Sequence, residues 1–197
     1  MCSSDLEDAL TGEIDGETVV TLTGRNPSGV GIEETKAMLR RFAERGAKIV
    51  IDSRSFSLSD LVEMKPWLIK PNQEEISAYC GTPVENMEDA LEKGKELASL
   101  GIENVMISMG EQGALLITKE QAFHAQAPCV QVVSTIGAGD SAIAGFLIAT
   151  ARGGDKEICL ATAVAFGTAA CQTQGTRPPE REAVQKLLPQ VQVTKRM

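Results

Sequence analysis

Short apolar runs rich in β-branched residues alternate along the chain with longer stretches in which apolar residues recur every three or four positions. The short runs are typical of buried strands, and the longer stretches have the period of helices. Strands are predicted at residues 18–23, 48–52, 67–70, 105–108 and 114–118, with a hairpin-like pair within 122–133. Helices are predicted at residues 32–45, 73–80, 87–100, 138–152, 156–174 and 182–188. This alternation predicts a layered α/β fold with a mostly parallel sheet.

The length of 197 residues is typical of one domain, and no repeat, low-complexity tract or linker divides the chain. Its 43% hydrophobic and 23% charged residues exclude intrinsic disorder. No uncharged apolar run reaches the roughly 18 residues that a membrane-spanning helix needs. Because no cationic and then apolar leader follows Met1, we expect a soluble protein of the cytoplasm.

Charge and side-chain inventory exclude several functions. The net charge of −8 opposes broad binding to nucleic acid or to anionic lipid. His124 is the one histidine, so a zinc site that needs two histidines is excluded. The five cysteines are irregularly spaced and odd in number, which favours reduced thiols over a disulfide framework.

The most informative segment is 134–146, STIGAGDSAIAGF, where an extended stretch meets two glycines and then a helix of small residues. Backbone N–H groups at a helix N-terminus lack intrahelical partners, and the helix dipole places partial positive charge there. Phosphate oxygens could therefore bind at Gly137, Ala138 and Gly139, where glycine lets a ligand approach the backbone.

Asp140 follows this predicted phosphate site directly. A carboxylate beside phosphate is useful if it accepts a proton from a hydroxyl that attacks the phosphorus. Asp140 could equally be an acidic residue in a helical first turn, where it would contribute about 0.3–1 kcal/mol. The spacing alone leaves both interpretations open.

A dinucleotide-binding site is the rival for this segment. Gly137, Gly139 and Ala142 satisfy the G-x-G-x-x-G/A spacing, which would make the protein a nicotinamide-dependent oxidoreductase. That fingerprint requires a second strand ending in an acidic residue about 20 positions on. The chain around Leu160 has a helical pattern and no acid, so this interpretation is disfavoured.

Four blocks, in order, resemble the ribokinase-like, PfkB-type carbohydrate kinases. GAGDSAIAGF, preceded by Thr135, is similar to the family's C-terminal signature. KPNQEE at 70–75 resembles its Asn-x-x-Glu motif, and SMGEQG at 108–113 resembles its nucleotide loop. GRNPSGV at 24–30 looks like a loop of the sugar-phosphate kinase branch, although Arg25 and Asn26 replace its usual serine and leucine.

The resemblance implies a three-layer ribokinase-like fold, with ATP and Mg²⁺ as the bound groups. Asp140 would be the general base, and the backbone of Gly137, Ala138 and Gly139 would form the anion hole. Asn72 and Glu75 would hold Mg²⁺ through its waters. Lys70 and Gly139 would contact the nucleotide together with the loop residues Ser108, Met109, Gly110, Glu111, Gln112 and Gly113.

Each role has a structural alternative. Asn72 and Glu75 also suit a helix start after Pro71. The segment 108–113 could be a plain turn between two strands, and Lys70 could be a charge at a strand end. His124 is expected to be structural or exposed to solvent.

The resemblance further implies that residues 1–197 are the C-terminal part of one kinase domain, without the family's N-terminal units and lid. Because those parts orient the hydroxyl and exclude water, the chain alone is expected to bind nucleotide weakly and to be inactive. The expected reaction is ATP-dependent phosphorylation of fructose 1-phosphate, with tagatose-6-phosphate kinase and 6-phosphofructokinase as alternatives. A noncatalytic nucleotide-binding fragment is the alternative of another class, and a homodimer is an open possibility. Val164 falls near the place of an adenine-side asparagine in ribokinases.

Overall fold

The computed structural model describes residues 14–26 and 28–196 and is built on one sheet. Seven strands follow one another across this sheet in the order of the sequence. They are β1 (Val19–Thr23), β2 (Lys48–Asp52), β3 (Leu68–Ile69), β4 (Asn104–Ser108), β5 (Ala114–Ile117), β6 (Ala122–Gln126) and β7 (Gln192–Arg196). Strands β1 to β4 pair in parallel, and β5, β6 and β7 then alternate in direction. Five of the seven strands thus run the same way, which confirms the mostly parallel sheet.

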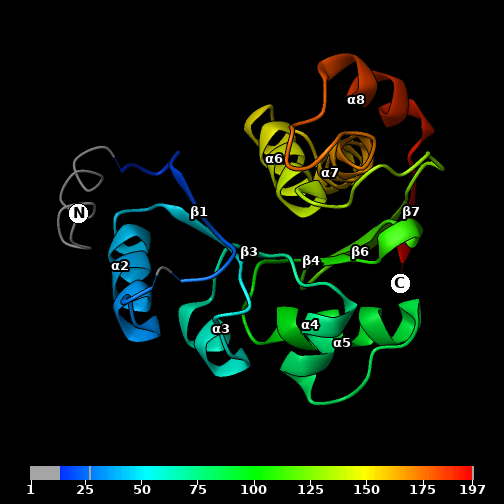
Figure 1. The fold of residues 1–197 in the computed structure, drawn as a ribbon. Helices are drawn as coiled ribbons and strands as arrows, with labels where there is room; N and C mark the ends of the chain where they lie inside the picture. Colours follow the sequence, from blue (N-terminus) through cyan, green and yellow to red (C-terminus); the bar gives the residue numbers. More distant parts are fainter. Residues whose placement is uncertain (1–13, 27, 197) are drawn as a thin grey trace.

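Helices cover both faces of the sheet and make three layers (Figure 1). One layer holds α2 (Ile32–Glu44), α3 (Leu58–Met64), α4 (Gln73–Cys80) and α5 (Met87–Ser99). The other holds α6 (Ala138–Ala151), α7 (Lys156–Ala170) and α8 (Arg181–Leu187), of which α7 packs on β5, β6 and β7. Two separate apolar clusters fill the interfaces, one for each face of the sheet. No helix within residues 14–26 and 28–196 is both long and apolar enough to cross a membrane.

Four features differ from the sequence prediction. The prediction of a hairpin-like pair within 122–133 is wrong. Only β6 forms there, and its second neighbour in the sheet is β7, which was not predicted. The sequence gives β7 no alternating apolar pattern, since QVTKR is a partly exposed edge strand. Helix α3 was also not predicted, although Ser57 and Asp60 form a capping box at its start and Leu61 is fully buried. Helix α7 ends at Ala170, four residues before the predicted end.

Helices α6 and α7 pack closely because glycines face the contact. A β-carbon added to Gly145 would lie 2.8 Å from the Thr162 carbonyl oxygen and 2.9 Å from Phe166 Cβ. A β-carbon on Gly167 would lie 3.2 Å from the Ala138 carbonyl oxygen. This packing fixes the start of α6, because Ala138 is the first residue of that helix.

We expect Gly145→Ala to destabilise the protein. Alanine in place of glycine usually adds about 1 kcal/mol to helix stability, but overpacking against α7 costs about 1–3 kcal/mol. Urea unfolding should therefore show a net loss of stability. Gly16→Ala, in a turn, is the control for an added methyl group without overpacking, since a β-carbon there meets no atom within 4 Å. Equal stability of both variants would contradict the proposed close packing.

Candidate active site

The carboxyl ends of β2, β3 and β4 bring two of the blocks that the sequence singled out, 70–75 and 108–113, side by side. The backbone N–H of Lys70, after β3, donates to the Ile51 carbonyl of β2 at 3.3 Å. The N–H of Ser108, at the end of β4, donates to the Pro71 carbonyl at 2.9 Å. Asn72 and Ser108 also form an isolated parallel bridge. The predicted metal and nucleotide blocks are therefore neighbours on one edge of the sheet.

A buried ion pair lies at this edge. The Lys70 ammonium is 3.1 Å from Asp52 Oδ2, and Lys70 is only 6% exposed. Burial raises the pKa of the Asp52 carboxyl above its usual value, an effect that the Lys70 charge opposes. The nearby carboxylates of Glu75 and Asp140 raise that pKa further. Lys70 is thus a buried cation among several acidic groups. An additional anion would be attracted by Lys70 and repelled by the acidic groups around it.

The first turn of α6 lies directly against this ion pair. Gly137 precedes the helix with a left-handed φ of 80°, which glycine adopts without strain. A β-carbon on Gly139 would lie 3.0 Å from Lys70 Nζ and 3.7 Å from Asp52 Oδ2. Glycine at position 139 therefore allows the lysine ammonium to lie beside the helix N-terminus, where two sources of positive potential combine.

Asp140 lies in the same first turn and is exposed to solvent. It directly follows Gly139, the residue of that turn whose β-carbon position lies 3.0 Å from Lys70 Nζ. The residues assigned to proton transfer and anion binding, Asp140 and Gly137 to Gly139, thus share one helix start, which contacts Lys70 through Gly139.

Asn72 and Glu75 form a capping box, so their structural alternative is confirmed. Asn72 Oδ1 accepts from the Glu75 N–H at 2.8 Å, and Glu75 Oε2 accepts from the Asn72 N–H at 3.0 Å. Glu75 Oε1 also accepts from Arg54 Nε at 2.8 Å. Each carboxylate oxygen has a second lone pair, so this set fits Mg²⁺ held through water. Within the described parts of the chain, no group of three or more His, Cys, Asp or Glu is placed to hold a metal.

The segment 108–113 is a turn between antiparallel strands, as its structural alternative predicts. Its centre is one 3₁₀ turn, Gly110–Gln112. Met109 is 3% exposed and packs into the apolar core, so its side chain supports the loop from within. Gly110, Glu111 and Gln112 are exposed.

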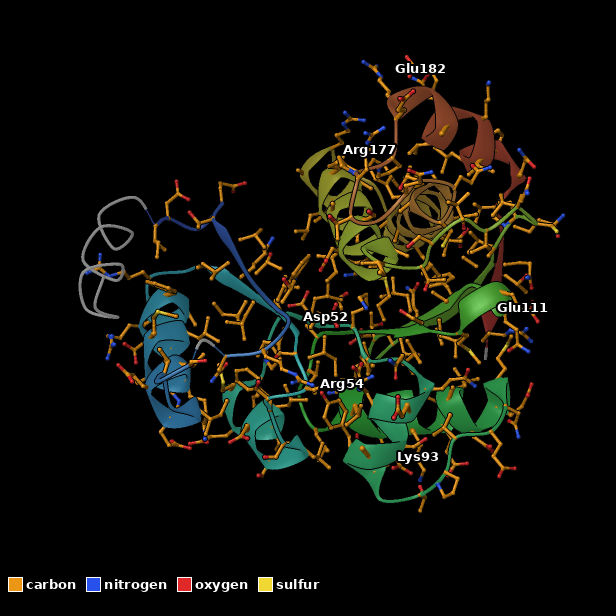
Figure 2. The ribbon with its side chains drawn as sticks, viewed as in Figure 1. Asp52, Arg54, Lys93, Glu111, Arg177 and Glu182 are labelled. Atoms are coloured by element: carbon orange, nitrogen blue, oxygen red, sulfur yellow. The ribbon has the colours of Figure 1, made fainter. Side chains whose placement is uncertain are left out.

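Asp52 and Arg54 are the residues that sequence reasoning missed. Figure 2 shows both near the middle of the view, between α6 and the layer of α3 and α4, and the Arg54 side chain is exposed to solvent. Arg54 binds Glu75 and also Glu74, at 3.2 Å. Asp52 could have been identified from the sequence, because it is an acidic residue at the end of a predicted strand. The carboxyl ends of parallel strands lie at the edge of an α/β sheet where ligands bind.

The dinucleotide interpretation lacks its structural context. Leu160 lies inside α7, and α6 is followed by that helix rather than by a strand. No βαβ unit therefore surrounds Gly137, Gly139 and Ala142, as the sequence indicated.

Comparisons with known proteins agree with this geometry. The 1-phosphofructokinase of Haemophilus influenzae is 36% identical over 177 residues, covering 89% of this chain and 56% of that protein. The enzyme of the same name from Bacillus subtilis is 35% identical, covering 90% and 58%. The chain thus spans a little over half the length of these relatives.

Solved structures share the fold. Phosphofructokinase-2 of Escherichia coli, in complex with substrates and products, superposes with a TM-score of 0.88 at 28% identity, covering 95% of this chain and 61% of that one. Ribokinase of Arabidopsis thaliana, complexed with ribose and ATP, gives 0.76 at 25% identity, covering 95% and 60%. The profile of the pfkB family carbohydrate kinases matches residues 5–183. The first turn of α6, which belongs to the signature segment, contacts Lys70, and the family profile matches most of the chain. The chain therefore belongs to the pfkB family of carbohydrate kinases.

Proposed function

We propose that this chain carries the catalytic base and the nucleotide site of an ATP-dependent sugar-phosphate kinase. The observation that carries the proposal is the contact between the first turn of α6 and the buried Lys70 ammonium. Such a place suits a terminal phosphate, because backbone N–H groups, helix dipole and ammonium all attract the same negative charge.

Phosphoryl transfer then needs one proton acceptor. Asp140 takes the proton of the sugar hydroxyl while the hydroxyl oxygen bonds to the γ-phosphorus of ATP and the bond to ADP breaks. The N–H groups of Gly137, Ala138 and Gly139 stabilise the charge on the oxygens of the transferred group. Asp140 is exposed, so its carboxylate is open to the incoming alcohol.

Asn72 and Glu75 are the residues that would hold Mg²⁺, through its water shell. When bound, the ion supplies charge that neutralises phosphate oxygens. Arg54 keeps the Glu75 carboxylate in place at 2.8 Å, so the carboxylate is positioned before any ion arrives.

Fructose 1-phosphate is the acceptor that we propose. The proposal is supported by the 1-phosphofructokinases that the chain resembles over about nine tenths of its length. Tagatose 6-phosphate and fructose 6-phosphate are the alternatives. We further propose that residues 1–197 are the C-terminal part of one kinase domain, because the chain covers little more than half of its relatives.

The deciding experiment measures ADP release with ATP, Mg²⁺ and each of the three ketohexose phosphates. It uses the purified 197-residue chain and the same chain preceded by any upstream segment encoded in its reading frame. We expect turnover with fructose 1-phosphate. Turnover with another ketohexose phosphate corrects the acceptor, and nucleotide binding without turnover in both proteins favours a noncatalytic nucleotide-binding fragment.

In the longer of these two proteins, Asp140→Asn should abolish turnover and preserve nucleotide binding. Asparagine has a similar shape and cannot accept the hydroxyl proton, so the rate should fall by about 100-fold or more. ATP affinity, measured by calorimetry, should change little because the backbone N–H groups remain.

Asp155→Asn is the matched control for that change. Asp155 opens the neighbouring helix α7 and accepts from the Ile158 N–H at 2.9 Å, a cap that asparagine also provides. This variant should keep parental turnover. If Asp140→Asn turns over within about tenfold of the parent, the base assignment fails.

Gly139→Ala should weaken ATP binding. The new β-carbon displaces only the flexible end of Lys70, which moves the ammonium away from the helix N-terminus. We expect the KM for ATP to rise about tenfold, the effect of losing one charge-assisted contact. Ala144→Ser, on an exposed position of the same helix, is the control. An unchanged KM for ATP would show that the Lys70 ammonium does not contribute to the phosphate site.

A second copy of the chain is a further proposed partner. Phosphofructokinase-2 of Escherichia coli has been described in a tetrameric inhibited form. Light scattering of the purified protein, with and without ATP, measures whether this chain also self-associates.

A further inference from the structure

Side chains from strand β6 hold the turn that follows β4. The ring Nε2 of His124 lies 2.7 Å from the Gln112 carbonyl oxygen. Gln126 Nε2 donates to the Glu111 carbonyl oxygen at 3.0 Å. Two successive carbonyls of the 3₁₀ turn are therefore bound by two side chains of one strand, spaced two residues apart and so on the same face of the sheet.

The backbone of the turn is also fitted to β6. Gly113 has a φ of 87°, and a β-carbon on it would lie 1.9 Å from the Ala125 carbonyl oxygen. The N–H of Met109 donates to the Gly113 carbonyl at 2.8 Å, which closes the turn at its base. These contacts fix the position of the turn relative to β6.

His124 is the polar exception in a buried strand segment. Its neighbours Ala122, Phe123 and Ala125 are buried and apolar, and His124 itself is only 6% exposed. A carbonyl oxygen can only accept, so Nε2 carries the proton in this contact. Both the neutral Nε2–H form and the imidazolium donate this bond, so the contact holds the turn in either state.

We infer that His124 and Gln126 are positioning residues that hold residues 110–113 in the shape that binds nucleotide. The inference rests on the proposed function for the assignment of this turn to the nucleotide. A turn fixed before the ligand arrives avoids the ordering cost of binding, so loss of either donor weakens affinity without touching the transferred phosphate. Proton transfer at Asp140 is unaffected.

The test compares four variants of the purified chain. His124→Leu and Gln126→Ala remove the donors, and His124→Gln restores an N–H donor at the buried position. Gln192→Ala is the matched control, because Gln192 lies opposite Gln126 in the β6–β7 register and is also exposed. Two quantities are measured for each: amide hydrogen exchange across residues 109–114 without ligand, and the affinity for Mg-ADP by calorimetry.

We expect faster exchange in the turn and about fivefold weaker Mg-ADP binding for the two donor-removing variants. His124→Gln should recover much of both, and Gln192→Ala should match the parent. If the donor-removing variants exchange and bind like the parent, the inference is overturned and the proposed function stands. If exchange rises while the parent itself binds no Mg-ADP, the turn is held as described and the proposed function fails. A loss of affinity with unchanged exchange also overturns the inference.

Discussion

The site depends on how closely the first turn of α6 approaches the carboxyl ends of β2 and β3. That approach requires glycine at two kinds of contact. Gly139 leaves room for the Lys70 ammonium, and Gly145 and Gly167 let α7 hold α6 in position from behind. Since protein interiors are close-packed, an added methyl group at any of these positions must move either a helix or a charged group.

Burial gives the Lys70 charge its effect. A lysine in water is screened, but this one is 6% exposed and lies between the Asp52 carboxylate and the start of a helix. The surrounding carboxylates of Asp52, Glu75 and Asp140 make the site acidic as a whole. An anionic ligand is therefore favoured only where the ammonium and the backbone N–H groups face it. The site thus favours one orientation of such a ligand.

Sequence patterns predicted the elements that have strong local causes. Helix α4 was predicted to the residue, because the capping pair Asn72 and Glu75 sets its start and Gly81 ends it in a left-handed conformation. Strand β7 was not predicted, because its partly exposed residues show no apolar alternation and it forms by pairing with β6. Helix α3 had the Ser57 and Asp60 capping signal but only one fully buried side chain, Leu61, in its seven residues.

The sequence by itself determined the fold class, the helix start at Ala138 and the three blocks that meet at the sheet edge. Periodicity, glycine placement and helix capping act over a few residues, so they can be read along the chain. Only the tertiary structure decided that Asp52 pairs with Lys70, that Arg54 holds Glu75, and that His124 holds the turn after β4. Those contacts join residues far apart or on different strands, and they follow from the register and packing of the whole sheet.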